Sequence, residues 1–230
     1  MPIPYASLDE LTAHVVECRL CPRLVEWRES VARSRRRAYA DQEYWGRPLP
    51  GFGDPQARLM IVGLAPGAHG SNRTGRNFTG DASGDFLYPA MHRAGFANQP
   101  NSLHRDDGLK LKDAYISATC RCAPPANKPT PAEIATCRPY LVAEIDLLPN
   151  IRGFVALGRI AFDWLLGWYK QRGAEVGSAV FAHNTLNRFA PGLPWLLASY
   201  HPSRQNTQTG RLTVEMFDQV WTQAAALLKE

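Results

Sequence analysis

The sequence predicts an α/β protein of three layers, α/β/α, with a short, mostly parallel, four-stranded sheet at its centre. Two observations carry this prediction. Apolar runs of strand length alternate with helical patterns along the chain, and such alternation is typical of parallel sheets joined by crossover helices. Each apolar run also ends in a polar or Gly/Pro-rich segment, as strands do where a sheet borders a binding site.

The predicted strands are four apolar runs rich in β-branched or aromatic residues. They cover 58–65 (RLMIVGLA), 114–119 (AYISAT), 153–157 (GFVAL) and 195–200 (WLLASY). Helical patterns cover 7–19, 84–95, 131–148, 159–172 and 213–228. The third of these helices has a clear start, because Thr130 is a suitable N-cap, Pro131 takes the first helical position and Glu133 lies in the first turn.

Length and composition favour one globular domain over residues 1–230. A chain of 25.6 kDa with 45% hydrophobic and 20% charged residues can bury a core and is unlike a disordered chain. No apolar run is long enough to cross a bilayer, and the N-terminal stretch MPIPYASLDELTAHVVECRL lacks the basic start and apolar centre of a signal peptide. We therefore expect a soluble, intracellular protein.

The basic residues outnumber the acidic ones modestly. The net charge is +5, from 26 Lys and Arg against 21 Asp and Glu, which is compatible with a polyanionic partner. Residues 33–55, a basic run RSRRR followed by a Pro/Gly-rich stretch, are predicted to form a long loop. A run of this kind is usually a solvated surface, and nucleic-acid contact is the alternative.

The segments that follow the four predicted strands should meet at one edge of the sheet. They read GLAPGAHGSNRTGRNFTGD, CRCAPPANKPTP, GRIA and HPSRQNTQTGR, in chain order. In an open parallel sheet, ligands bind in the crevice beyond the carboxyl ends of the strands. The sequence therefore predicts a composite binding site built from all four segments.

The five cysteines suggest a metal centre. Cys18 and Cys21 form a C-x-x-C, whereas Cys122 and Cys137 lie fifteen residues apart. In an intracellular chain such a set favours metal binding over disulfides, and all-thiolate ligation suits zinc or an iron–sulfur cluster. Ordinary buried thiols are the alternative. Strand alternation puts Cys120 on the same face as Cys122, so that either residue qualifies as a ligand.

The motifs also resemble a known family. The segments GLAPGAHGSNRTGRNFTGD, RCAPPANKPTP, LGRIA and HPSRQNTQTGR, in this order behind a C-x-x-C, are similar to those of the uracil-DNA glycosylase superfamily. The resemblance spans roughly residues 15 to 220 and is greatest for family 5, the iron–sulfur-containing type-b enzymes of bacteria and archaea. It implies a single α/β/α domain and a [4Fe–4S] cluster with a structural role, and Cys120 is then a spare thiol. The ligand positions of the family fall on Cys18, Cys21, Cys122 and Cys137.

The chain departs from other branches of the superfamily at two places. Where those branches carry an acidic residue, as in GQDPY or GEAPG, this sequence has Leu64 and Ala65. The family-5 pattern points instead to Asp81 as the residue that positions or activates water. Ala118 stands where related enzymes place an Asn that reads uracil, which suggests a roomier pocket that also accepts hypoxanthine or xanthine.

The resemblance assigns roles to further residues. Alongside Asp81, His201 would donate to the base O2, and Asn127 matches a polar site residue. Glycines of the first motif would let the backbone approach a flipped nucleotide, and Phe78 would stack on its base. The residues expected around the base are Gly63, Leu64, Ala65, Gly67 and Phe78. Those expected to contact DNA are Arg73, Arg76, Ser203, Arg204, Gln205, Asn206 and Arg211.

Each of these residues also has a purely structural explanation. Asp81 precedes a predicted helix and suits an N-cap. Phe78 is of a type usually found in a core, and an isolated His such as His201 is usually structural. Asn127 lies in a Pro-rich stretch and suits a turn.

Taken together, the motifs predict a monofunctional DNA glycosylase that removes uracil and other deaminated bases, a monomer in the cytoplasm associated with the nucleoid. No Lys in the motif loops is expected to form a Schiff base, so no strand cleavage is predicted. A non-catalytic sensor of deaminated DNA on the same fold is the first alternative. An iron–sulfur electron carrier is the second, although GLAPGAHG does not contain the G-x-G-x-x-G of nucleotide cofactor sites.

Overall fold

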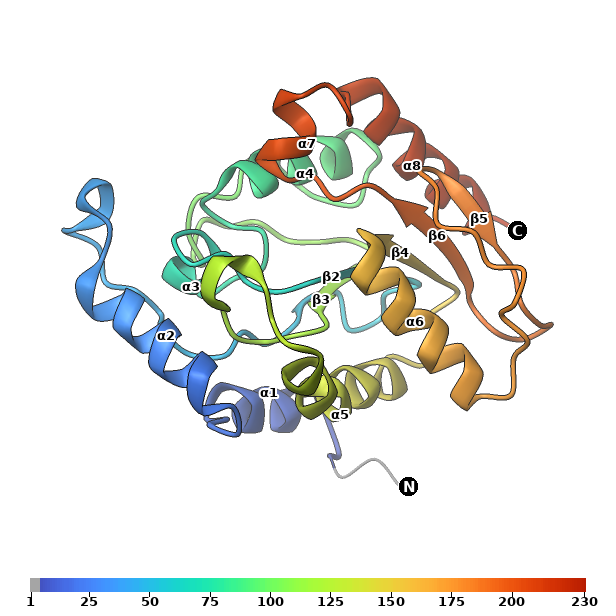
Figure 1. Ribbon diagram of the computed structural model, residues 1–230. Coiled ribbons are helices and arrows are strands. Elements are labelled where there is room, and N and C mark those ends of the chain that lie inside the picture. Colours follow the sequence, from blue (N-terminus) through green and yellow to red (C-terminus); the bar gives the residue numbers. More distant parts are fainter. Residues whose placement is uncertain (1–4) are drawn as a thin grey trace.

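The computed structural model describes residues 5–230 and contains a six-stranded sheet with the strand order β1-β3-β2-β4-β6-β5 (Figure 1). Residues 1–4, at the start of the N-terminal stretch considered above, lie outside the described part. The strands are β1 (Phe52–Gly53), β2 (Leu59–Gly63), β3 (Ala114–Ala118), β4 (Gly153–Leu157), β5 (Thr185–Asn187) and β6 (Trp195–Ser199).

The four predicted strands form the parallel centre of this sheet. β3, β2, β4 and β6 pair in parallel, whereas β1 and β5 add to the two edges in antiparallel orientation. The prediction of a four-stranded sheet is therefore wrong in number. The edge strands have only two and three residues, which is too short for a periodic pattern to reveal them.

Helices cover both faces of the sheet, as predicted (Figure 1). On one face, α4 (Ala82–Arg93) and α8 (Val214–Leu227) pack on side chains such as Ile61 and Val155. On the other face, α5 (Pro131–Leu147) and α6 (Arg159–Gln171) pack on side chains such as Met60 and Phe154. Because the central strands are buried on both faces, they read as continuous apolar runs.

The helix start predicted at Thr130 is confirmed. Thr130 Oγ1 accepts a hydrogen bond from the Glu133 backbone N–H at 3.2 Å, and the Thr130 N–H donates to the Glu133 carboxylate at 2.7 Å. This reciprocal pair is a capping box, which satisfies two N–H groups that a helix start leaves without partners.

The N-terminal region contains one helix more than predicted. The pattern assigned to 7–19 forms α1 (Leu8–Val16), and a separate helix α2 (Pro22–Ser34) follows it. Pro22 takes the first position of α2, where its missing N–H costs nothing. The long loop predicted after α2 contains the short helix η1 (Arg37–Tyr39) and β1.

Three other short helices lie in the segments that follow strands. They are α3 (Ser71–Thr74), η2 (Pro125–Asn127) and α7 (Arg204–Gln208). Within residues 5–230, no helix is both long and apolar enough to span a membrane.

Candidate active site

A cavity of about 880 Å³ lies at the carboxyl edge of the sheet, where the sequence predicts a composite site. It brings together most of the predicted site residues: Gly63, Leu64, Ala65, Gly67, Phe78, Asp81, Asn127, His201, Ser203, Arg204 and Gln205. These residues come from the segments after β2, β3 and β6. The segment after β4 reaches the same place through Gly158, where an added Cβ would lie 3.4 Å from the His201 Cβ.

Asp81 is both an N-cap and a cavity residue. Its Oδ1 accepts hydrogen bonds from the backbone N–H groups of Ser83 at 3.0 Å and Gly84 at 3.3 Å, which begins α4. Burial raises the pKa of the Asp81 carboxyl above its ordinary value, against the lowering effect of these two bonds. Within residues 5–230 no group donates to Oδ2, so that oxygen is free to accept from a bound water.

Glycines of the first motif make room for the Asp81 carboxylate. An added Cβ would lie 1.9 Å from Asp81 Oδ2 at Gly70 and 3.0 Å from it at Gly67. At Gly63, the same addition would lie 2.9 Å from Cζ of Phe78. The motif predicts bare backbone beside a nucleotide, whereas in the structure the glycines leave room for two side chains of the site, those of Asp81 and Phe78.

Phe78 and His201 form an aromatic pair in the cavity. Their ring centroids are 5.8 Å apart with an interplanar angle of 33°. Burial lowers the pKa of His201 to about 4, so the imidazole is neutral at pH 7 and carries one N–H donor. Asn206 does not line the cavity, but its side chain donates to the His201 carbonyl at 2.9 Å and fixes the loop.

Asn127 faces the cavity from a strained turn. Ala126 and Asn127 both have left-handed backbone conformations, with φ of 52° and 56°. Asn tolerates this region better than most residues do. Asn127 therefore forms the turn and also lines the cavity. Its side chain is exposed.

Two arginines predicted to contact phosphates are instead turned into the protein. Arg76 is 3% exposed and forms a bidentate ion pair with Asp107 at 2.7 and 2.9 Å. Arg73 is buried and donates to the carbonyl groups of His69 and Gly80, both at 2.8 Å. These contacts do not fit the predicted phosphate binding, and they explain how the first motif keeps its shape.

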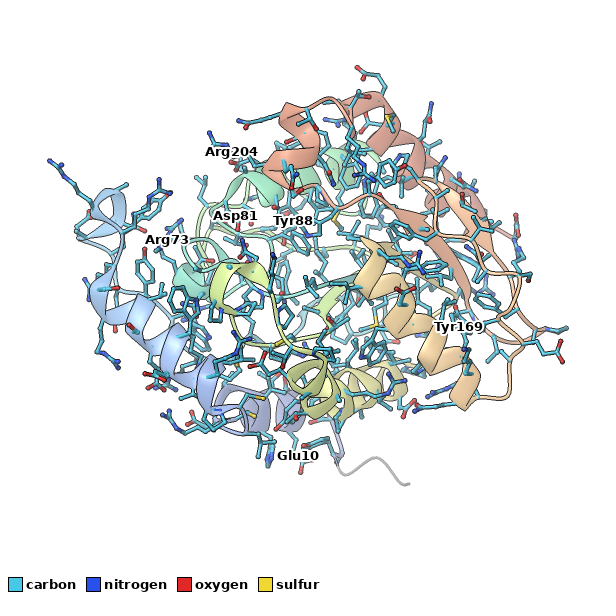
Figure 2. The ribbon with its side chains drawn as sticks, in the orientation of Figure 1. Glu10, Arg73, Asp81, Tyr88, Tyr169 and Arg204 are labelled. Carbon is cyan, nitrogen blue, oxygen red and sulfur yellow. The ribbon has the colours of Figure 1, made fainter. Side chains whose placement is uncertain are left out.

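The other predicted DNA contacts remain accessible. Arg204 and Gln205 are exposed on α7 at the rim of the cavity, and Figure 2 shows Arg204 and Arg73 on different sides of Asp81. Ser203 caps α7 by accepting from the Asn206 N–H at 3.4 Å. Arg211 is exposed but lies outside the cavity lining, with its guanidinium 4.8 Å from the centre of the Tyr200 ring.

Some cavity residues were not predicted as site residues. Arg36 and Tyr39 line the cavity although they belong to the loop after α2. His69 lines it too, and its Nδ1 lies 3.1 Å from the Tyr44 hydroxyl. The basic run RSRRR is the one signal in the sequence that pointed to this side of the site.

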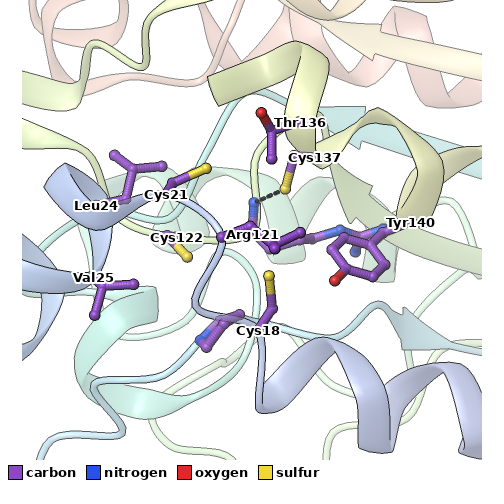
Figure 3. Close-up of a pocket in the computed structure, with 11 residues that line it drawn as sticks. Cys18, Cys21, Leu24, Val25, Arg121, Cys122, Thr136, Cys137 and Tyr140 are labelled. Atoms are coloured by element: carbon purple, nitrogen blue, oxygen red, sulfur yellow. Dashed lines mark hydrogen bonds between the residues drawn. The ribbon is translucent and has the colours of Figure 1, made fainter. Parts of the chain in front are cut away.

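A second pocket, here called the cysteine pocket, is lined by Cys18, Cys21, Cys122 and Cys137 (Figure 3). Cys21 is the N-cap of α2 and Cys137 lies in α5, so the pocket joins the N-terminal helices to the rest of the molecule. Cys120 does not line it; its thiol is buried and lies 3.6 Å from the Cys122 carbonyl.

Two fully buried arginines flank the cysteine pocket. Arg28 donates to Cys122 Sγ at 2.9 Å, and the backbone N–H of Arg121 donates to Cys137 Sγ at 3.3 Å, drawn dashed in Figure 3. Arg28 Nε and two guanidinium nitrogens of Arg121 have no partner among residues 5–230. Unpartnered buried donors are costly, and an anionic group bound by the four thiolates would offset that cost.

The four cysteines line one pocket. Within residues 5–230, no three His, Cys, Asp or Glu side chains are gathered closely enough to hold one metal ion. Burial raises the pKa of Cys122 to about 12, so its ionisation requires positive charge nearby, which bound iron and Arg28 would supply.

The chain is similar in sequence to proteins of one known superfamily. The model of the uracil DNA glycosylase superfamily matches residues 50–225. A type-5 uracil-DNA glycosylase of Thermus thermophilus is 57% identical over 96% of this chain and 97% of its own length. Proteins of the same name from Mycobacterium leprae and Pyrobaculum aerophilum are 51% and 45% identical, over 96% and 97% of this chain and 96% and 94% of their own lengths.

Proposed function

The chain belongs to the uracil-DNA glycosylase superfamily, and from that premise we propose that it hydrolyses the N-glycosidic bond of uracil in DNA as a step of DNA repair. The observation that carries the proposal is the cavity that holds Asp81, Asn127, Phe78 and His201 together. A base in a duplex must leave the stack to reach such a cavity. Phe78 is placed to stack on the extruded base.

Asp81 and His201 would act on opposite sides of the sugar carbon C1′. As the C1′–N1 bond breaks, positive charge develops on the sugar, and the bonding electrons pass to the base. Asp81 Oδ2 would hold a water against C1′ and accept its proton as the new C1′–O bond forms. The neutral His201 would donate its N–H to the base oxygen that gains negative charge, an interaction worth about 3 kcal/mol when the donor is preorganised.

We also propose that the enzyme accepts other deaminated bases. Ala118 and Ala65 line the cavity with small apolar side chains, which give no hydrogen bond to distinguish uracil from hypoxanthine or xanthine. Beyond the His201 donor, whose partner oxygen all three bases carry, the pocket would discriminate by shape, which separates related ligands weakly, by about 1–3 kcal/mol. This supports a broad substrate range.

We propose that the cysteine pocket holds a [4Fe–4S] cluster. Cys18, Cys21, Cys122 and Cys137 would hold it, and Arg28, which donates to Cys122 Sγ, would compensate part of its negative charge. The cluster would supply a rigid link between α2 and α5, and none of the chemistry at the sugar depends on it. We further propose that the protein acts as a monomer and is recruited to DNA in the cell.

A substrate panel tests the proposal. Purified protein is mixed with labelled duplexes that each carry one U, hypoxanthine, xanthine or T, and alkali reveals abasic sites. We expect alkali-dependent cleavage at U and weaker cleavage at hypoxanthine and xanthine. Cleavage without alkali would contradict the absence of a lyase step. Tight binding to the U duplex with no abasic product would instead favour the sensor.

A further inference from the structure

We propose that the chain at the end of α2 is a second surface that binds the DNA backbone. It would bind the DNA strand on a different side of the cavity from α7. This surface is named here the arginine arm and comprises residues 33–39, from the last residues of α2 to the end of η1. This inference rests on the proposed function. It adds a contact surface that the resemblance does not assign.

The arginine arm reaches the cavity itself. Arg36 and Tyr39 line the cavity that contains Asp81 and His201, as does Arg204 of α7. In Figure 1 the chain after α2 projects on the left of the view, whereas α7 lies at the top. A strand that places one nucleotide in the cavity must leave it on two sides, so a single contact surface at α7 would hold only one of them.

The charge of the arm suits phosphate groups. Arg33, Arg35, Arg36 and Arg37 are all exposed, and within residues 5–230 none of them forms an ion pair. Two acids, Asp41 and Glu43, follow in the sequence, so the arm keeps a positive excess. Arginine binds phosphate with a planar fork of donors, and most protein–DNA hydrogen bonds go to the backbone.

The arm is held in place by the first motif. The Arg73 guanidinium lies 4.0 Å from the centre of the Tyr39 ring and donates to Gln42 at 2.5 Å, while it also binds the Gly80 carbonyl next to Asp81. The Trp45 backbone N–H donates to the Arg73 carbonyl at 2.9 Å. The buried Arg73 thus joins the arm to the loop that carries Asp81, which is its role in place of direct phosphate binding.

Tyr44 holds the backbone of the arm near His69. The Arg36 backbone N–H donates to the Tyr44 hydroxyl at 3.3 Å, and that hydroxyl lies 3.1 Å from His69 Nδ1. Arg36 and His69 both line the cavity. Arg36 accordingly offers a charged group to a strand on this side of the cavity.

A charge-matched pair of variants tests the arm. Arg36→Gln with Arg37→Gln removes two exposed charges from it. The control, Arg152→Gln with Lys170→Gln, removes two exposed charges at the start of β4 and the end of α6, near the opposite edge of the sheet. Affinity for a duplex with a tetrahydrofuran abasic-site analogue is measured from 50 to 300 mM KCl, and thermal unfolding confirms that both proteins fold.

The arm variant should bind about tenfold more weakly at 100 mM salt, and the slope of log affinity against log salt should flatten by about 2. The control should match the wild type. An unchanged slope in the arm variant, or an equal loss in the control, would overturn the inference.

The binding assay separates this inference from the proposed function. A wild-type protein that excises uracil, with an arm variant that binds DNA normally, would refute the arm alone. A wild-type protein that binds the analogue through the arm but excises no base would refute the proposed function alone.

Discussion

The cavity and the cysteine pocket are both built from segments far apart in the sequence, yet they treat their polar groups in opposite ways. Around the cavity, Arg73 and Arg76 are satisfied by protein carbonyl and carboxylate groups. Around the cysteine pocket, Arg28 keeps one buried nitrogen and Arg121 two without partners among residues 5–230, although Arg121 also forms a buried ion pair with Glu144. A site that exchanges its ligand has to be stable while empty, whereas a site with a resident group can depend on it.

This comparison makes its largest prediction at the cysteine pocket. Cys122→Ser should lose iron and destabilise the fold by about 3–5 kcal/mol, because Arg28 would be left buried without its anionic partner. For a chain of this size the unfolding midpoint should fall by about 10 °C. Iron content and thermal unfolding measure both effects.

Cys120→Ser is the matched control, since Cys120 is buried but lies outside the pocket lining. It should keep its iron. If Cys120→Ser loses iron and Cys122→Ser retains it, the two neighbouring residues have been assigned the wrong way round.

The next largest effect is expected at Gly70, where the cavity is most sensitive to shape. Gly70→Ala places a Cβ 1.9 Å from Asp81 Oδ2 and must displace the carboxylate. We expect a loss of about 100-fold in the single-turnover excision rate, the usual cost of a displacement of about 1 Å. Gly67→Ala, at 3.0 Å, should lose less.

Gly177→Ala serves as the control, because an added Cβ there meets nothing within 4 Å. It should excise uracil at the wild-type rate. Wild-type excision by Gly70→Ala would mean that the position of Asp81 does not limit the reaction.

The pH dependence of the excision rate tests the roles of Asp81 and His201. His201 has a pKa of about 4, and burial raises the pKa of Asp81. Excision should therefore be level around neutral pH and fall in acid, by about tenfold per pH unit once Asp81 is protonated. A rate that rises as the pH falls from 7 to 5.5 would point to a protonated His201 as the acid.

The same His201 pKa affects stability. Between pH 6.5 and about 4 the unfolded chain binds a proton at this histidine and the folded chain does not, so stability should rise with pH across that window. His201→Gln should weaken this dependence, as urea unfolding at pH 5 and pH 7 would show.

The smallest effect is expected at the rim. Arg204→Ala removes one exposed charge from α7 and should weaken duplex binding only a few-fold, with a salt slope reduced by about 1. Salt titrations of the variant measure this directly. A loss as large as that of Gly70→Ala would mean that Arg204 acts on the chemistry rather than on the backbone.

The sequence predicted the parallel centre of the fold well, because β2, β3, β4 and β6 are buried on both faces and read as unbroken apolar runs. It missed α2, whose four buried residues include the charged Arg28. The motifs located most of the cavity residues, because these lie at or after the ends of strands, but not Arg36 and Tyr39, which follow α2.

What the sequence did not predict depends on contacts between distant segments. Arg76 reads as a phosphate ligand until Asp107, 31 residues away, is seen to bind it. Tyr39 becomes part of the cavity wall only because Arg73 stacks on its ring. Strand alternation would put Cys120 and Cys122 on the same face. The chain bends between them, however, and only Cys122 lines the cysteine pocket.

The most direct test of the account is single-turnover excision of uracil from a duplex by the wild type and by Asp81→Asn. Asn caps helices about as well as Asp does, so the variant should fold normally while its side chain can no longer accept a proton from water. The account predicts alkali-labile product from the wild type and a loss of about 10²- to 10⁴-fold in the variant. Equal rates for the two proteins would contradict it.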